Sequence, residues 1–226
     1  YKWKPSTASI GMHQSLTAEI DLDAAKRFGV DVVRRVSGGG AVFHDQMGEI
    51  TYAVICRLND LPEPSALTKI FDPSIPYRYQ PILEALAKGL EKIGISIDQG
   101  KIHCPALLVG GKKISGNAQA IRSNILLQHG TILLHVQPEL MYHILKAPEG
   151  VSYTKMVQSV RSKVIGLYDL PISHENQTGA PSNIESRLIE AMKIAFSDVF
   201  QIELFEQPLS DRSEEHTSEL QSPNTI

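Results

Sequence analysis

A run of twelve residues, Arg34–Asp45 (RRVSGGGAVFHD), combines the residue types that bind a negatively charged group. Its three central glycines, Gly38–Gly40, carry no Cβ atoms, so successive backbone N–H groups can close around an anion. The two arginines at its start supply planar, permanently charged donors that suit a phosphate or a carboxylate. A hairpin turn with solvated arginines would also contain such glycines. The arginines, the glycines and His44–Asp45 within a dozen positions nevertheless favour an anion-binding site.

A second candidate segment, residues 110–119 (GGKKISGNAQ), has two adjacent lysines after a Gly-Gly turn. On a strand, Lys112 and Lys113 point to opposite faces, so one can face a buried site while the other stays solvated. A lysine beside small residues, here Ser115, Gly116 and Ala118, could neutralise a phosphate or a developing oxyanion. Charged residues also protect edge strands from aggregation. From these residues alone, both interpretations stay open.

Alternating strands and helices would position these two segments. The hydrophobic pattern predicts strands at 8–12, 30–35, 41–44, 50–57, 95–97, 107–109, 113–120, 125–135 and 202–205, and helices at 22–28, 79–93, 138–145 and 182–200. Residues 58–76 contain four prolines and predict a loop with one helical turn near 67–71. Hairpins around long helices indicate an α+β domain, with a mixed, mostly antiparallel sheet flanked by helices.

Composition limits the classes of function. The 226 residues carry a formal net charge of -3, which argues against nucleic acid or an anionic membrane as a partner. Cys56 and Cys104 cannot form a disulfide framework and predict a reducing, cytoplasmic location. We expect one catalytic domain over residues 1–211, without its native N-terminus. Residues 212–222 (RSEEHTSELQS) match a translated sequencing adapter, so residues 212–226 are expected to be a non-native, disordered tail.

The two segments, together with Leu127–His135 (LQHGTILLH), resemble the three signature blocks of the lipoate–protein ligase family. Gly11–Gln14 (GMHQ) resembles the family's earlier G-x-x-Q element, and Arg161–Val164 (RSKV) resembles its R-S-[RK]-V element. The resemblance runs in order from about Tyr1 to about Asp211. The glycine block and the lysine block at this spacing are highly specific together.

The resemblance implies the biotin/lipoate-ligase fold, shared with octanoyltransferases, and a two-step reaction. Lipoate, the substrate, would attack the α-phosphorus of ATP, with Mg²⁺ held mainly by the ATP and no metal site on the protein. A lysine of a lipoyl domain would then displace AMP. The implied acceptors are the lipoyl domains of 2-oxoacid dehydrogenase E2 subunits and the glycine cleavage H protein. A separate accessory ligase subunit is a further implied partner, and no nucleic acid or membrane is expected.

By match to the family's motifs, Lys113 is the expected catalytic residue and would contact both the phosphate and the lipoyl carbonyl. Ala118, beside Gly116 and Asn117, would line the acyl tunnel, and His129 is a further candidate ligand contact. The expected binding residues for the adenylate phosphate and the acyl carbonyl are Arg35, Ser37, Gly38, Gly39, Gly40, Ala41, Val42, Phe43 and His44.

The sequence also departs from the family pattern. Many ligases have Asn-Asp before the lysine hairpin, whereas Cys104–Leu107 (CPAL) has no carboxylate to assist a metal. Residues 49–52 (EITY) match the E-[IL]-T-Y form that some ligases share with octanoyltransferases. These departures leave three activities open: a ligase, an octanoyltransferase, and a binding subunit that needs an accessory domain to adenylate.

An octanoyltransferase would carry its acyl group from acyl carrier protein on a cysteine, and Cys104 is the candidate nucleophile. Cys104 lies nine residues before Lys113, nearer than the cysteine expected of a transferase, so a buried structural cysteine is the preferred interpretation. The triple glycine favours the ligase, because related transferases often have Gly-Gly-Arg there.

Overall fold

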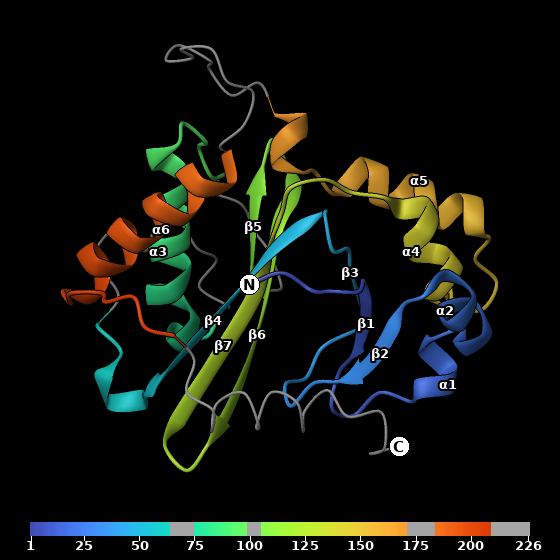
Figure 1. Cartoon of the computed structure of the whole chain (residues 1–226), viewed down its shortest axis with the longest axis horizontal. Helices are drawn as coiled ribbons and strands as arrows, with labels where there is room; N and C mark the ends of the chain where they lie inside the picture. Colours follow the sequence, from blue (N-terminus) through green and yellow to red (C-terminus); the bar gives the residue numbers. More distant parts are fainter. Residues whose placement is uncertain (64–74, 99–104, 171–183, 209–226) are drawn as a thin grey trace.

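Two β-sheets form the centre of the molecule (Figure 1). The computed structural model describes residues 1–63, 75–98, 105–170 and 184–208. The smaller sheet has the order β2-β1-β3 and consists of β1 (Thr7–Ile10), β2 (Asp31–Arg34) and β3 (Val42–His44). The larger sheet has the order β4-β7-β6-β5 and consists of β4 (Glu49–Arg57), β5 (Ala106–Val109), β6 (Lys112–Arg122) and β7 (Ile125–Leu133). Only the β1–β2 pair is parallel among the strands described, which confirms the predicted α+β fold with a mixed, mostly antiparallel sheet.

Helices cover the two sheets separately (Figure 1). The larger sheet packs against α3 (Gln80–Lys92) and α6 (Ile184–Phe200), and four shorter helices lie beside the smaller sheet: α1 (Leu16–Glu19), α2 (Leu22–Phe28), α4 (Pro138–Ile144) and α5 (Tyr153–Lys163). Apolar side chains at helical spacing in α3, including Ile82, Leu86 and Leu90, are almost completely buried. Each sheet therefore has its own hydrophobic core.

Alternation along β7 gives the larger sheet two different faces. Leu126 and Ile132 belong to the core that includes α3 and α6. His129 and Thr131 are at odd positions and point to the opposite face, which we call the inner face. The strand register places Ala118 of β6 opposite His129, and Gly116 opposite Thr131, so both small residues also lie on the inner face.

Two predicted strands are wrong. Residues 95–97 form no strand, because the N–H of Ile95 still bonds to the carbonyl of Leu90 at the end of α3. Residues 202–205 leave α6 through Gln201, which has a φ of 52°, and they are exposed. Short apolar runs do not distinguish a strand from a helix end or an exposed tail.

The two short helices α1 and α5 were not predicted. The expected helical turn near 67–71, the cap of α6, Cys104 and the tail at 212–226 all lie outside the described residues. Within the described ranges, no helix is both long and apolar enough to cross a membrane.

Candidate functional site

Arg35 holds the glycine loop (residues 37–41) from the inside. Its Nη1 donates to the carbonyl and to the Oγ of Ser9, both at 3.2 Å. Its Nη2 donates to the carbonyls of Gly38 at 2.9 Å and Gly40 at 2.7 Å. Burial lowers the pKa of the Arg35 guanidinium from its ordinary value. The arginine that was expected to bind a ligand phosphate is therefore engaged with the loop's own carbonyl groups.

The backbone amides of the glycine loop are available to a ligand. Among the described residues, no backbone hydrogen bond uses the N–H of Gly38, Gly39 or Gly40. Gly39 and Gly40 are exposed, and Gly38 is half-buried. A loop whose carbonyls are bound inside and whose N–H groups are unpaired can stabilise an anion or a developing oxyanion.

A β-bulge turns Lys113 toward the inner face. Residues three apart on a regular strand point to opposite faces, so Lys113 and Gly116 should not meet. The β5–β6 register shifts between Leu107 and Leu108, which inserts one extra residue into β6. A Cβ built on Gly116 would lie 2.7 Å from the Nζ of Lys113 and 2.8 Å from its Cε. The lysine side chain therefore lies directly over Gly116.

The segment that follows α5 supports the lysine backbone. Val164 forms a β-bridge with Lys113, and the N–H of Ile165 donates to the Lys113 carbonyl at 3.0 Å. Arg161, in the same R-S-K-V element, forms an ion pair with Glu139 of α4. This element thus connects the catalytic candidate to the helices beside the smaller sheet.

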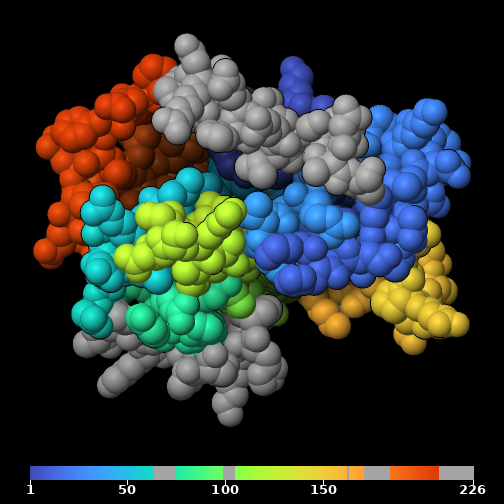
Figure 2. All heavy atoms as spheres, turned by 90° about the horizontal axis from the view of Figure 1, so that it is seen from below, coloured from blue at the N-terminus to red at the C-terminus, as the bar shows by residue number. Residues whose placement is uncertain are grey.

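A hydrogen bond between Ser37 and His129 joins the glycine loop to the inner face. The Ser37 Oγ lies 2.7 Å from the His129 Nε2, and Ser37 is 1% exposed. Burial, and then the nearby charge of Arg35, lowers the pKa of His129 to about 4. His129 is therefore neutral at pH 7, and its Nε2 can accept a hydrogen bond from the Ser37 hydroxyl. Figure 2 shows yellow-green residues of the β6–β7 hairpin beside blue residues from the N-terminal part of the chain, to which the glycine loop belongs.

Protonation of His129 should destabilise the protein in acid. The folded pKa of about 4 lies below the ordinary value of 6.5, so the unfolded chain binds more protons between these pH values. We expect the free energy of unfolding to fall by about 1–3 kcal/mol as pH falls from 6.5 to about 4. This range is smaller than the full pKa shift implies, because His129 is partly exposed to solvent. Urea unfolding at pH 7 and pH 4.5 of wild type and His129→Gln measures the effect. Equal losses in the two proteins would contradict it.

The structure brings some predicted site residues together and separates others. Together on the inner face or facing it are Arg35, Ser37, Gly38, Gly39, Gly40, Lys113, Gly116, Ala118 and His129. The side chain of Asn117 lies on the opposite face, where its Oδ1 accepts from Tyr52 and its Nδ2 donates to the Pro105 carbonyl. Phe43 is buried in the smaller sheet's core, so only its backbone is available to a ligand.

Three further predicted positions lie on β3 or just before it. Ala41 is half-buried, Val42 is 37% exposed, and His44 is buried with Ser9 and Glu49 as hydrogen-bond partners. Sequence reasoning gave no role to Ser9 or Glu49. The match of residues 49–52 to the E-[IL]-T-Y form was the one feature of the sequence that could have drawn attention to Glu49.

Gly39 is the position in the loop where a side chain should be least tolerated. Its φ is 98°, and a Cβ there would lie 3.0 Å from the Arg35 Nη2. We expect Gly39→Ala to cost about 1–3 kcal/mol of stability. Gly38→Ala is the matched control, because a Cβ at Gly38 would have no neighbour within 4 Å and the φ of Gly38 is not positive. Thermal unfolding of both variants tests this, and equal stability of the two would contradict it.

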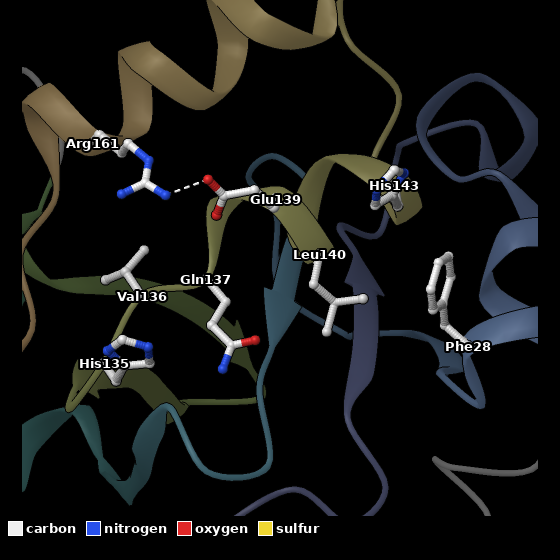
Figure 3. A pocket seen from close by; sticks show the side chains of 8 residues that line it. All are labelled: Phe28, His135, Val136, Gln137, Glu139, Leu140, His143 and Arg161. Carbon is white, nitrogen blue, oxygen red and sulfur yellow. Dashed lines mark hydrogen bonds and ion pairs between the residues drawn. The ribbon is translucent and has the colours of Figure 1, made fainter.

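Two other hollows lie outside this site. One, of about 540 Å³, is lined by Phe28, His135, Val136, Gln137, Glu139, Leu140, His143 and Arg161 (Figure 3). The Arg161–Glu139 ion pair lies along it, and the His143 ring stacks on Phe28. The other is a mostly apolar groove of about 650 Å³ between β4 and α6. Neither is lined by the glycine loop or by Lys113.

The fold and the site define an enzyme of the biotin/lipoate ligase superfamily. Residues 1–178 match the Lipoyl protein ligase A/B catalytic domain, and the chain belongs to this family. Among solved structures, a bi-partite lipoate protein ligase from Thermoplasma acidophilum superposes with a TM-score of 0.72 at 26% identity, over 96% of this chain and 76% of that one. Lipoate-protein ligase A bound with ATP has a TM-score of 0.70 at 23% identity, over 96% of this chain and 77% of that one, which supports the fold.

Similar curated sequences are octanoyltransferases. Octanoyltransferase LipM of Brevibacillus brevis is 30% identical over 93% of this chain and 78% of its own length. The Clostridioides difficile relative of the same name is 30% identical over 97% of this chain and 81% of its own. The Symbiobacterium thermophilum relative is 32% identical over 72% of this chain, and the match covers 62% of that protein's length. The chain is thus an enzyme of the lipoate ligase and octanoyltransferase family, which acts in protein lipoylation.

Proposed function

We propose that this protein is an octanoyltransferase, which moves an octanoyl group from acyl carrier protein to the acceptor lysine of a lipoyl domain. The observation that carries the proposal is the roughly 30% identity to octanoyltransferases along most of the chain. The site geometry suits acyl transfer, because Lys113 and the unpaired amides of the glycine loop can both stabilise a negatively charged oxygen. The E2 lipoyl domains and the glycine cleavage H protein are the proposed acceptors, and residues 1–211 the proposed catalytic unit.

The proposed chemistry has two acyl-transfer steps. A cysteine thiolate attacks the carbonyl carbon of the octanoyl thioester, and the carrier's thiolate leaves. The amine of the acceptor lysine then attacks the enzyme thioester, an amide forms, the cysteine thiolate leaves and the amine loses a proton. Cys104 is the proposed nucleophile, although its spacing from Lys113 favoured a structural role, because burial raises the pKa of the only other cysteine in the sequence, Cys56. Lys113 and the amides of Gly38–Gly40 would stabilise the oxyanion formed in each step.

ATP-dependent ligation of lipoate, the activity expected from the sequence, becomes the second candidate. Two observations favour it: the triple glycine and the 26% identity to the bi-partite archaeal ligase. The unpaired amides of the glycine loop fit an adenylate phosphate as well as an oxyanion. Mg²⁺ would enter with the ATP. A separate accessory subunit would be the additional partner in this case.

The acyl donor distinguishes the two candidates. We expect octanoyl–acyl carrier protein without ATP to octanoylate a lipoyl domain, and octanoate or lipoate with ATP to do so poorly. Cys104→Ser should abolish transfer from the carrier protein. Mass spectrometry of the lipoyl domain measures both reactions.

Cys56 is the matched control, since burial raises the pKa of its thiol and makes it a poor nucleophile. Cys56→Ser should leave transfer from the carrier unchanged. Efficient modification with ATP and free acid, unaffected by Cys104→Ser, would instead establish the ligase.

A further inference from the structure

A row of hydrogen bonds runs from the glycine loop to a buried carboxylate. The Arg35 Nη1 donates to the Ser9 Oγ at 3.2 Å, and this Oγ lies 2.9 Å from the His44 Nε2. The His44 Nδ1 lies 2.6 Å from the Glu49 Oε1. Ser9, His44 and Glu49 are 1%, 6% and 2% exposed. The proposed chemistry uses none of these three residues directly.

The direction of each hydrogen bond follows from the groups at the two ends of the row, Arg35 and Glu49. A guanidinium can only donate, so the Ser9 Oγ is an acceptor toward Arg35. At the other end the Glu49 carboxylate accepts from the His44 Nδ1, which leaves the Nε2 of a neutral imidazole to accept from the Ser9 hydroxyl. With Nε2 as an acceptor, the imidazole proton sits on Nδ1 and is donated to Glu49. The four side chains are therefore aligned in one donor-to-acceptor order that ends on the carboxylate.

Glu49 is fixed from a second side as well. The Thr51 hydroxyl donates to the same Oε1 at 3.0 Å, and the Trp3 Nε1 donates to the Thr51 Oγ1 at 3.0 Å. The Trp3 ring also stacks on the His44 imidazole with centroids 4.5 Å apart. A buried carboxylate with several aligned donors holds its neighbours in one geometry, because every alternative leaves a buried polar group unpaired.

We propose that Glu49 is a positioning residue for acyl transfer. It orients His44 and Ser9, which hold Arg35 in the conformation that binds the carbonyls of Gly38 and Gly40. The amides of the glycine loop are thereby kept available to the reacting carbonyl. The expected loss of acyl transfer rests on the proposed function. The expected displacement of the glycine loop does not.

The loop effect can be measured without any substrate. The N–H of Met12 donates to the Ser37 carbonyl at 2.9 Å, so hydrogen exchange at Met12 reports whether the loop is in place. We expect faster Met12 exchange, by NMR, in Glu49→Met and Ser9→Ala, which remove the acceptor and the linking hydroxyl. Glu49→Gln keeps a carbonyl acceptor and should restore slow exchange. Thr51→Val is the control, because it cuts the second side of Glu49 and leaves His44, Ser9 and Arg35 joined.

Kinetics should follow the same order. With octanoyl–acyl carrier protein, kcat should fall by about 10- to 100-fold in Glu49→Met and Ser9→Ala, and by less than about threefold in Glu49→Gln and Thr51→Val. If Glu49→Met does not fold, Ser9→Ala decides. Unchanged Met12 exchange in Ser9→Ala, or equal acceleration by Thr51→Val, would overturn the inference. A further outcome is faster Met12 exchange in Glu49→Met and Ser9→Ala while the wild-type protein fails to use octanoyl–acyl carrier protein. That result would support the role of Glu49 in holding the loop and would reject the proposed function.

Discussion

Replacement of Lys113 by alanine is expected to reduce acyl transfer by about 10²- to 10³-fold while the fold is retained. The ammonium lies over Gly116 on the inner face, where it can neutralise the oxyanion of an acyl transfer. Its backbone is held by Ile165 and does not depend on the side chain. The change in unfolding free energy should stay within about 0.5–1 kcal/mol, as for a lysine outside the core. Initial rates of lipoyl-domain acylation, with thermal unfolding in parallel, measure both quantities.

Lys112→Ala is the matched control for this prediction. Lys112 has the same side chain and the same strand, but it precedes Lys113 and points to the other face. It should transfer acyl groups at close to the wild-type rate. Inactivation by Lys112→Ala together with full activity of Lys113→Ala would show that the two faces have been assigned wrongly.

Arg35→Lys should produce the second large effect, although it keeps the positive charge. The guanidinium makes four hydrogen bonds through two nitrogens to Ser9, Gly38 and Gly40, and a single ammonium cannot reproduce this fork. We expect a loss of about 2–4 kcal/mol in stability, because the carbonyls of Ser9, Gly38 and Gly40 lose charged donors and only that of Ser9 belongs to a buried residue. We also expect about a 10²-fold loss in kcat/KM, because the loop amides move. Urea unfolding and steady-state kinetics measure the two losses.

Arg34→Lys separates loss of the loop from general loss of an arginine. The Arg34 Nη1 donates to the carbonyls of Gly11, Met12 and Gln14, in the turn before α1. This variant should lose stability, but kcat/KM should fall by less than about tenfold. An Arg34→Lys variant as inactive as Arg35→Lys would contradict the specific role of Arg35.

Elements with local signals could be predicted from the sequence. The helix at 22–28 ends at Gly29, whose φ of 64° satisfies the left-handed position expected there. The β6–β7 hairpin turns at Ser123 and Asn124, which both have a positive φ. By contrast, α5 has few buried apolar positions; Val157 is buried while Tyr153 is exposed, so its pattern gave little helical signal.

The features of the site that could not be predicted depend on contacts far apart in the sequence. Ser9 and His44 are 35 residues apart, and Ser37 and His129 are 92 apart, so no local pattern encodes either pair. The role expected of Arg35 came from its chemical type and from the match to the family's motif. The structure shows that its N–H groups donate to the loop's own carbonyls. The sequence alone does not indicate which of several nearby acceptors an arginine will bind.

The bulge between β5 and β6 has a consequence for how this hairpin tolerates errors in strand pairing. In a regular ladder, a slip of one residue exchanges the two faces of a strand and would remove a single lysine from the site. Here Lys112 and Lys113 are adjacent in β6. The extra residue, Ile114, follows them and lies opposite the step from Leu107 to Leu108 in β5. Loss of the bulge would pair Leu108 with Ile114 and turn Lys112, in place of Lys113, toward the inner face. Because the residue before Lys113 is also a lysine, a one-residue slip that removes the bulge would still leave a positive charge on the inner face.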